Sequence, residues 1–183
     1  MGWKMNEIKF NGRGGQGVVM ASQMLGLAFF KAGMYPQCYS LFGGERRGAP
    51  VVSFLRVDRE KILLKCEIRN PAELLCFDAG LLNTDEIRTT MPAGGRILVN
   101  AAQVPESLSG LSGYTLLRIG AGSISEKLGL GHVINTTILG AYCRLNTDLP
   151  IEHVVSAVEE MVPAKKDLNI QAVRLGYQEA EIL

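Results

Sequence analysis

The stretch "FNGRGGQGVV", residues 10–19, decides the fold of this chain. An alternating apolar pattern precedes it and an apolar repeat at helical spacing follows it, so its glycines lie between a strand and a helix. Gly12, Gly14 and Gly17 have the G-x-G-x-x-G spacing of a dinucleotide-binding turn. The stretch therefore predicts a βα unit and raises the question of what the glycine turn is for.

The elements beside this turn are expected to be a strand over 6–12 and a helix over about 15–32. In the strand, Ile8 and Phe10 share one face. The helix has two apolar stripes, which predicts that it is covered on both sides, by the sheet and by either a neighbouring helix or a partner subunit. The first stripe contains Val18, Ala21, Ser22, Leu25, Ala28 and Phe29, and the second contains Met20, Met24 and Leu27.

Further along, strand and helix patterns alternate. Residues 51–57 and 62–66 alternate as the strands of a hairpin should, joined around 58–61. Buried strands are expected in "ELLCFDAG", ending at Asp78, in "GGRILVNA", ending at Asn100, and in "YTLLRIG". Helices are expected over 81–91, 130–145, from Ile151 onward and over about 165–181.

These patterns predict an α/β fold: a single doubly wound, mostly parallel sheet with helices on both faces, a β-hairpin insertion and C-terminal helices. No repeat, low-complexity linker or boundary divides the chain. We therefore expect residues 1–183 to form one domain.

The composition and charge of the chain limit the kinds of partner that it can bind. Of the 183 residues, 47% are hydrophobic and only 20% are charged, and the mean hydropathy is +0.14. This is apolar for a soluble monomer, which leaves two explanations open: a thick core, or apolar surface that meets another chain. The net charge of +1 and the lack of a basic stripe argue against nucleic acid as a partner.

The cysteines and the N-terminal sequence favour a cytoplasmic protein. Four scattered cysteines form no C-x-x-C pair, which argues against an iron–sulfur cluster or a metal site held by this chain alone. The start, "MGWKMNEIKF", lacks the pattern of a signal peptide, and the uncharged run over 14–30 is short for a membrane span. We expect no membrane association.

The glycine turn has three possible uses. A nicotinamide site would need an acidic residue about 20 positions further on, and "MYPQCYSLF" at 34–42 has none. The glycines could instead allow close packing of strand, helix or another chain, or they could bind a phosphate-bearing ligand at an interface, because a helix N-terminus attracts anions. The candidate residues for such a contact are Gly12, Arg13, Gly14, Gly15, Gln16 and Gly17.

A second glycine-rich loop, "FGGERRGAP" at 42–50, is the other candidate site. Its contact residues are Glu45, Arg46, Arg47 and Gly48. Paired arginines suit recognition of carboxylate or phosphate, although such a loop can also be a solvated one whose arginines pair with nearby acids. Proximity to the Arg13 loop would favour recognition.

Other side chains give no catalytic site. His132 and His153 stand apart from any acidic or cysteine cluster. Asp78, at a strand end, could be catalytic or could cap the next helix. No G-x-S-x-G elbow is present. We therefore predict no catalytic residue and no metal ligand in this chain.

The two loops together, "GRGGQGVV" and "FGGERRGAPVVSFLRVD", resemble the gamma subunit of the 2-oxoacid:ferredoxin oxidoreductases, which corresponds to the gamma domain of the fused pyruvate:ferredoxin enzymes. The ending "KKDLNIQAVRLGYQEA" is similar to the closing helix of that family, so the resemblance covers essentially the whole chain. The ERRGAPV form looks like the pyruvate and branched-chain (ketoisovalerate) members, although Gly44 departs from many relatives and leaves the oxoacid open.

The resemblance implies an accessory role in a complex that converts a 2-oxoacid and coenzyme A to acyl-CoA and carbon dioxide while reducing ferredoxin. It implies alpha, beta and delta partner subunits, with thiamine diphosphate and iron–sulfur clusters held there and no cofactor held by this chain alone. The isolated chain is then expected to be inactive, and it could form a homodimer. The alternatives are a stand-alone nucleotide-binding oxidoreductase and a homo-oligomeric binding module.

Overall fold

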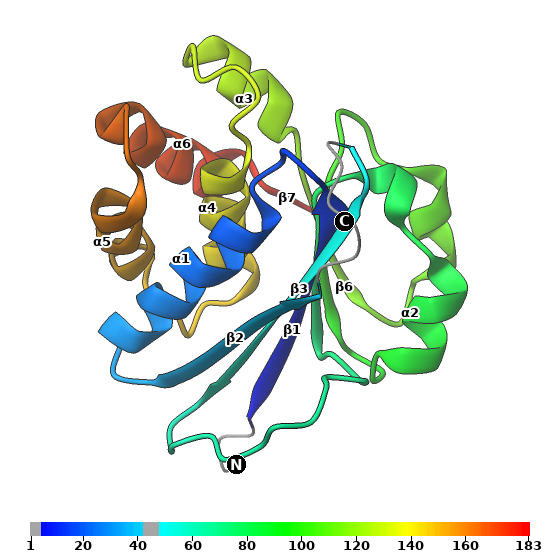
Figure 1. Ribbon diagram of the computed structural model, residues 1–183. Coiled ribbons are helices and arrows are strands. Elements are labelled where there is room, and N and C mark those ends of the chain that lie inside the picture. Colours follow the sequence, from blue (N-terminus) through cyan, green and yellow to red (C-terminus); the bar gives the residue numbers. More distant parts are fainter. Residues whose placement is uncertain (1–4, 42–47) are drawn as a thin grey trace.

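The computed structural model describes residues 5–41 and 48–183, and its centre is one seven-stranded sheet (Figure 1). The strand order is β2-β3-β1-β4-β5-β6-β7. The strands are β1 (Asn6–Arg13), β2 (Tyr35–Leu41), β3 (Pro50–Asp58), β4 (Glu73–Cys76), β5 (Arg96–Asn100), β6 (Thr115–Ile119) and β7 (Glu181–Ile182).

The central strands confirm the predicted doubly wound α/β class. β1, β4, β5 and β6 run parallel, so their carboxyl ends meet at one edge of the sheet. β3 pairs antiparallel with both β1 and β2, and β7 pairs antiparallel with β6, which makes the sheet mixed. The strands expected to end near Asp78 and Asn100 and within "YTLLRIG" are β4, β5 and β6.

Helices cover both faces, as predicted (Figure 1). One face carries α1 and four further helices over a large core, and the other carries α2 and two 3-10 turns over a smaller one. The helices are α1 (Val18–Lys31), α2 (Thr84–Thr90), α3 (Ala121–Lys127), α4 (Asn135–Leu145), α5 (Ile151–Met161) and α6 (Lys166–Glu179), and the 3-10 turns are η1 (Ala79–Leu81) and η2 (Glu106–Gly110).

The predicted hairpin is present but was placed wrongly. The partner of β3 is β2, with Tyr35 opposite Asp58 and Leu41 opposite Val52, whereas residues 62–66 form no strand. Local alternation could not distinguish the two partners, because it reports which residues suit a strand and not which neighbour completes the ladder. Residues 59–72 instead connect β3 to β4.

The first helix begins three residues later than predicted. Gly15 and Gly17 have φ of 97° and 74°, which an α-helix does not accept, so α1 starts at Val18. Its first stripe is buried against the sheet, and of the second stripe Met24 is fully buried. α1 packs against α5, so a neighbouring helix provides the second cover. Met20 is left 39% exposed.

The closest helix pair is α4 with α6, and two glycines make it possible. A Cβ on Gly140 would lie 1.9 Å from the Val173 carbonyl oxygen, and one on Gly176 would lie 2.0 Å from the carbonyl oxygen of Thr137. Main chain therefore meets main chain at this crossing. Among the described residues, no helix is long and apolar enough to cross a bilayer.

Candidate functional site

The glycine turn lies at the carboxyl edge of the sheet, between β1 and α1. Gln16 closes it, because its N–H donates to the Arg13 carbonyl at 3.1 Å and its side-chain Oε1 accepts from the Arg13 N–H at 2.7 Å. Gly12 has no room for a side chain, since a Cβ would lie 2.6 Å from Val18 Cγ2 and 2.8 Å from Phe77 Cβ. Close strand–helix packing, one of the three uses considered for these glycines, therefore explains Gly12.

Gly17 allows both the left-handed turn before α1 and the close approach of Asn135 on α4. It is the residue before α1, in the left-handed region, and a Cβ there would lie 2.6 Å from Asn135 Nδ2. Gly17, the N-cap of α1, has no side chain to cap the helix, and the first turn carries no acidic residue. Within residues 5–41 and 48–183, the first N–H groups of this 14-residue helix therefore remain available to an anion or to an acceptor on another chain.

The two glycine-rich loops are adjacent where both are described. Gly14 N–H donates to the Ala49 carbonyl at 2.8 Å, and Gly48 N–H donates to the Gly14 carbonyl at 3.1 Å. Arg13 Nη1 also reaches the Gly48 carbonyl, at 3.4 Å. The predicted contact residues Glu45, Arg46 and Arg47 lie outside the described residues. Gly48 and Ala49 therefore place the second loop beside the Arg13 loop. This proximity favours recognition of a carboxylate or phosphate over a loop that only contacts solvent.

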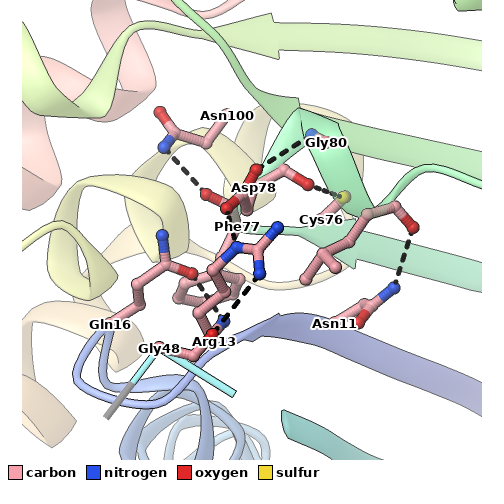
Figure 2. Close-up of polar contacts among 10 residues, drawn as sticks. Asn11, Arg13, Gln16, Gly48, Cys76, Phe77, Asp78, Gly80 and Asn100 are labelled. Atoms are coloured by element: carbon pink, nitrogen blue, oxygen red, sulfur yellow. Dashed lines mark hydrogen bonds and ion pairs between the residues drawn. The ribbon is translucent and has the colours of Figure 1, made fainter. Parts of the chain in front are cut away.

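An ion pair ties the turn to the end of β4 (Figure 2). Arg13 Nε lies 2.5 Å from Asp78 Oδ2, while Asp78 Oδ1 accepts from the Gly80 N–H at 2.9 Å and so caps η1. Burial by itself would raise the pKa of Asp78, but the hydrogen bonds from Arg13 and Gly80 and the charge of Arg13 hold it below its usual value. Of the two roles considered for Asp78, its geometry shows capping, together with an ion pair that the sequence did not reveal.

Asn100 is a positioning residue that sequence reasoning missed. Its Nδ2 donates to the Phe77 carbonyl at 3.0 Å, as Figure 2 shows, and its Oδ1 accepts from the Ala121 N–H at 2.9 Å. It thereby links the end of β5 to the loop after β4 and to the start of α3. The available signal was an amide residue at the end of a buried strand, where carboxyl edges of parallel strands meet.

A groove of about 410 Å³ borders the turn on the side of α4 and α6. Its walls are mostly apolar and include Met20 and Val133, which are 39% and 40% exposed. Asn135 also lines the groove, and only 5% of this residue is exposed. A wider hollow of about 930 Å³ borders Gly14 and Gly15, so the turn is open to a ligand or a partner chain.

The strand arrangement does not provide the acidic position of a nicotinamide site. The position beside β1 that a parallel strand takes in a dinucleotide-binding fold is taken by the antiparallel β3. β2, the strand that follows α1, is at the sheet edge and carries no carboxylate. Among the described residues of this hairpin, the acidic residue is Asp58, which ends β3 beside the start of β1, at the end of the strands opposite the glycine turn.

The described residues contain no group of three or more histidine, cysteine or acidic side chains that could hold a metal ion. His132 lies exposed beside the groove. Burial raises the pKa of the Cys38 thiol to about 11 and those of Cys76 and Cys143 to about 12, so these thiols stay protonated near neutral pH. What the described residues offer beside the glycine turn is a pair of hollows that a ligand or a partner chain could enter.

Comparison with known proteins gives the family. The sequence profile of the family described as "Pyruvate ferredoxin/flavodoxin oxidoreductase" matches residues 7–179. The chain is 39% identical over 160 residues to "Pyruvate/ketoisovalerate oxidoreductases common subunit gamma" of Thermococcus kodakarensis, covering 85% of this chain and 86% of that one. It is 35% identical to "Pyruvate synthase subunit PorC" of Methanothermobacter marburgensis, covering 95% and 97%.

A solved structure agrees with these sequences. The crystal structure of the pyruvate oxidoreductase subunit PORC of Thermotoga maritima superposes with a TM-score of 0.84 at 30% identity, covering 98% of this chain and 99% of that one. The likeness therefore includes the glycine turn, the β2–β3 hairpin and the C-terminal helices together. On the profile, the sequences and the fold alike, this chain belongs to the pyruvate ferredoxin/flavodoxin oxidoreductase family, and its similarity to gamma and PorC subunits covers most of its length.

Proposed function

We propose that this chain is the accessory gamma subunit of a 2-oxoacid:ferredoxin oxidoreductase of the pyruvate and ketoisovalerate type. The complex converts a 2-oxoacid and coenzyme A to acyl-CoA and carbon dioxide and passes the electrons to ferredoxin. The chain acts in the cytoplasm with alpha, beta and delta subunits. Thiamine diphosphate and iron–sulfur clusters, which supply the decarboxylation and electron-transfer chemistry, are held by those subunits.

The observation that carries this proposal is the uncapped N-terminus of α1 beside two adjacent glycine-rich loops. Main-chain N–H groups, the positive end of the helix dipole and the guanidinium of Arg13 meet there. Such a site suits the phosphates of coenzyme A, and a subunit that binds and positions this ligand while other subunits react needs no metal centre of its own. Arg46 and Arg47 of the neighbouring loop are proposed to contact the same anion or a neighbouring subunit.

A charge-insertion experiment on the assembled complex tests this role. Gly15 is exposed and has φ of 97°, a backbone conformation that Asp tolerates better than most residues. Gly15→Asp places a carboxylate at the helix N-terminus, so the KM for coenzyme A should rise by about tenfold or more while the KM for pyruvate stays unchanged. The matched control is Gly33→Asp, since Gly33 has φ of 82° and open space around it at the far end of α1.

Three results would count against the proposal. If Gly15→Asp and Gly33→Asp gave the same KM for coenzyme A, the glycine turn would not approach that ligand. If the isolated chain bound a nicotinamide nucleotide at micromolar concentration in calorimetry, the stand-alone oxidoreductase would explain the chain better. A complex that formed and turned over without this chain would remove the accessory role altogether.

A further inference from the structure

The segment 60–67, "EKILLKCE", is patterned as a strand but forms none in the isolated chain. In an extended chain, Ile62, Leu64 and Cys66 would share an apolar side, and the opposite side would carry charged residues and Leu63. Within the part of the chain that the structure describes, no main-chain group of 60–67 pairs with another main-chain group. Leu63 is 79% exposed and Leu64 is 46% exposed, so two adjacent leucines contact solvent. Unpaired main chain and exposed leucines in one strand-like segment indicate a missing neighbour.

Side chains of the β2–β3 hairpin hold this segment in place. Gln37 Nε2 donates to the Leu64 carbonyl at 2.9 Å, and Arg56 Nη2 lies 3.7 Å from Cys66 Sγ. Just beyond the segment, the Ile68 N–H donates to the Tyr39 hydroxyl at 2.5 Å. The segment is therefore fixed at several points and presents the rest of its main chain outward. A pre-ordered strand loses less conformational entropy on pairing than a free one.

The charges of the segment point to the chemistry of the neighbour. Lys61, Leu63 and Lys65 are two residues apart, so in an extended chain their side chains share one side, and Glu67 is the next residue on that side. All four are exposed, and neither lysine has an ion-pair partner among the described residues, so the part of this side around Leu63 is basic. Opposite charges and apolar pairs facing each other across strands stabilise a ladder. A complementary strand would carry acidic residues on both sides of an apolar one.

We propose that segment 60–67 pairs, as an added β-strand, with an exposed strand of another subunit of the oxidoreductase complex, one with an acidic–apolar–acidic alternation. This inference rests on the proposed function in one respect, since it requires that partner subunits exist. The segment begins just after β3, whose last residues lie beside the start of β1 (Figure 1). The proposed strand contact therefore lies near the start of β1, whereas the glycine turn follows the end of β1. Because the two lie at opposite ends of this strand, they can be tested separately.

The test is assembly of the full complex with Leu63→Asp and, separately, with Lys61→Glu/Lys65→Glu. Each should weaken retention of this chain by about tenfold or more, measured by titrating the tagged variant against the remaining subunits. Val104→Asp is the matched control, because Val104 is also a largely exposed apolar residue, at 53%, and lies between β5 and η2. Thermal melting of each isolated variant checks that the fold is kept.

Hydrogen exchange gives a readout that does not depend on a substitution. Amides of 62–66 should exchange at nearly the free rate in the isolated chain and about 100-fold more slowly in the complex. Unchanged exchange in a complex that contains this chain, or retention of Leu63→Asp equal to that of Val104→Asp, would overturn the proposal. Protection that appears in the isolated chain at high concentration, with a dimeric mass, would assign the strand contact to a second copy instead. None of these outcomes depends on the KM for coenzyme A.

Discussion

Replacing Gly17 by alanine separates backbone strain from steric collision at the glycine turn. Gly17 has φ of 74°, and a Cβ there would lie 2.6 Å from Asn135 Nδ2 and 3.0 Å from its Cγ. Gly33 provides the comparison, because its φ of 82° imposes similar strain while a Cβ would meet nothing within 4 Å. Gly17→Ala and Gly33→Ala should therefore differ by the collision with Asn135 alone.

The expected magnitudes follow from these distances. An alanine in the left-handed region costs about 1 kcal/mol, and the lower entropy of the unfolded chain offsets roughly 0.5 kcal/mol of it, so Gly33→Ala should destabilise by about 0.5 kcal/mol. Forcing a methyl group against a buried side chain adds about 1–3 kcal/mol, so Gly17→Ala should destabilise by about 1.5–3.5 kcal/mol. For a domain of this size, these values lower Tm by about 2 °C and about 8 °C.

Thermal and urea unfolding of both variants, with Asn135→Ala and the double variant Gly17→Ala/Asn135→Ala, measures these values. Removing the Asn135 amide should relieve the collision, so the double variant should be about 1–2 kcal/mol more stable than the sum of the single effects predicts. Equal losses for Gly17→Ala and Gly33→Ala, or strictly additive losses in the double variant, would refute the proposed contact between the turn and α4.

Three further changes probe the ion pair, the buried carboxyl and the helix crossing. Asp78→Asn keeps a cap acceptor but frees the charge of Arg13, so calorimetry on the isolated chain should show tighter coenzyme A binding, and weaker binding would mean that Asp78 positions Arg13. Burial raises the pKa of the Glu73 carboxyl in the folded chain above its value in the unfolded chain. The protonated carboxyl therefore favours the folded state: this contribution to the free energy of unfolding is complete below about pH 4 and is lost as the pH rises through the folded pKa. Glu73→Gln should flatten that decline in urea unfolding, and an unchanged slope would contradict it. Gly140→Ala forces α4 and α6 apart and should cost about 3 kcal/mol or more by circular dichroism melting. Gly122→Ala, which has open space within α3, should instead stabilise by about 0.5 kcal/mol, because alanine is the better helix former.

The candidate site was predictable where the neighbouring residues in the sequence indicate a residue's role. The glycine turn was found because its spacing follows a strand and precedes a helix. The ion pair between Arg13 and Asp78 was not, because 65 positions separate the partners and each has a plausible local role. The same holds for Asn100, whose two partners come from a loop and a helix that only the sheet brings together.

The misplaced hairpin shows the limit for strands. Both 35–41 and 62–66 can be extended, yet β3 pairs with the first. Packing partly explains why β3 pairs with β2. Cys38 on β2 lies against Gly26 of α1, and a Cβ at Gly26 would be only 2.8 Å from the Cys38 sulfur. A hydroxyl chain from Ser22 through Ser53 to Ser40, with oxygens 2.6 Å and 2.8 Å apart, further joins the helix to both strands.

The sequence by itself determined the α/β class and the position of the glycine turn, because periodicity, turn residues and residue type act over a few neighbouring positions. Only the tertiary structure decided which strands pair, that Asp78 forms an ion pair with Arg13, and that the main chain of 60–67 pairs with no other main-chain group among the described residues. Those outcomes depend on competition between distant segments for the same hydrogen bonds and the same buried surface, and that competition is resolved only when the whole sheet has formed.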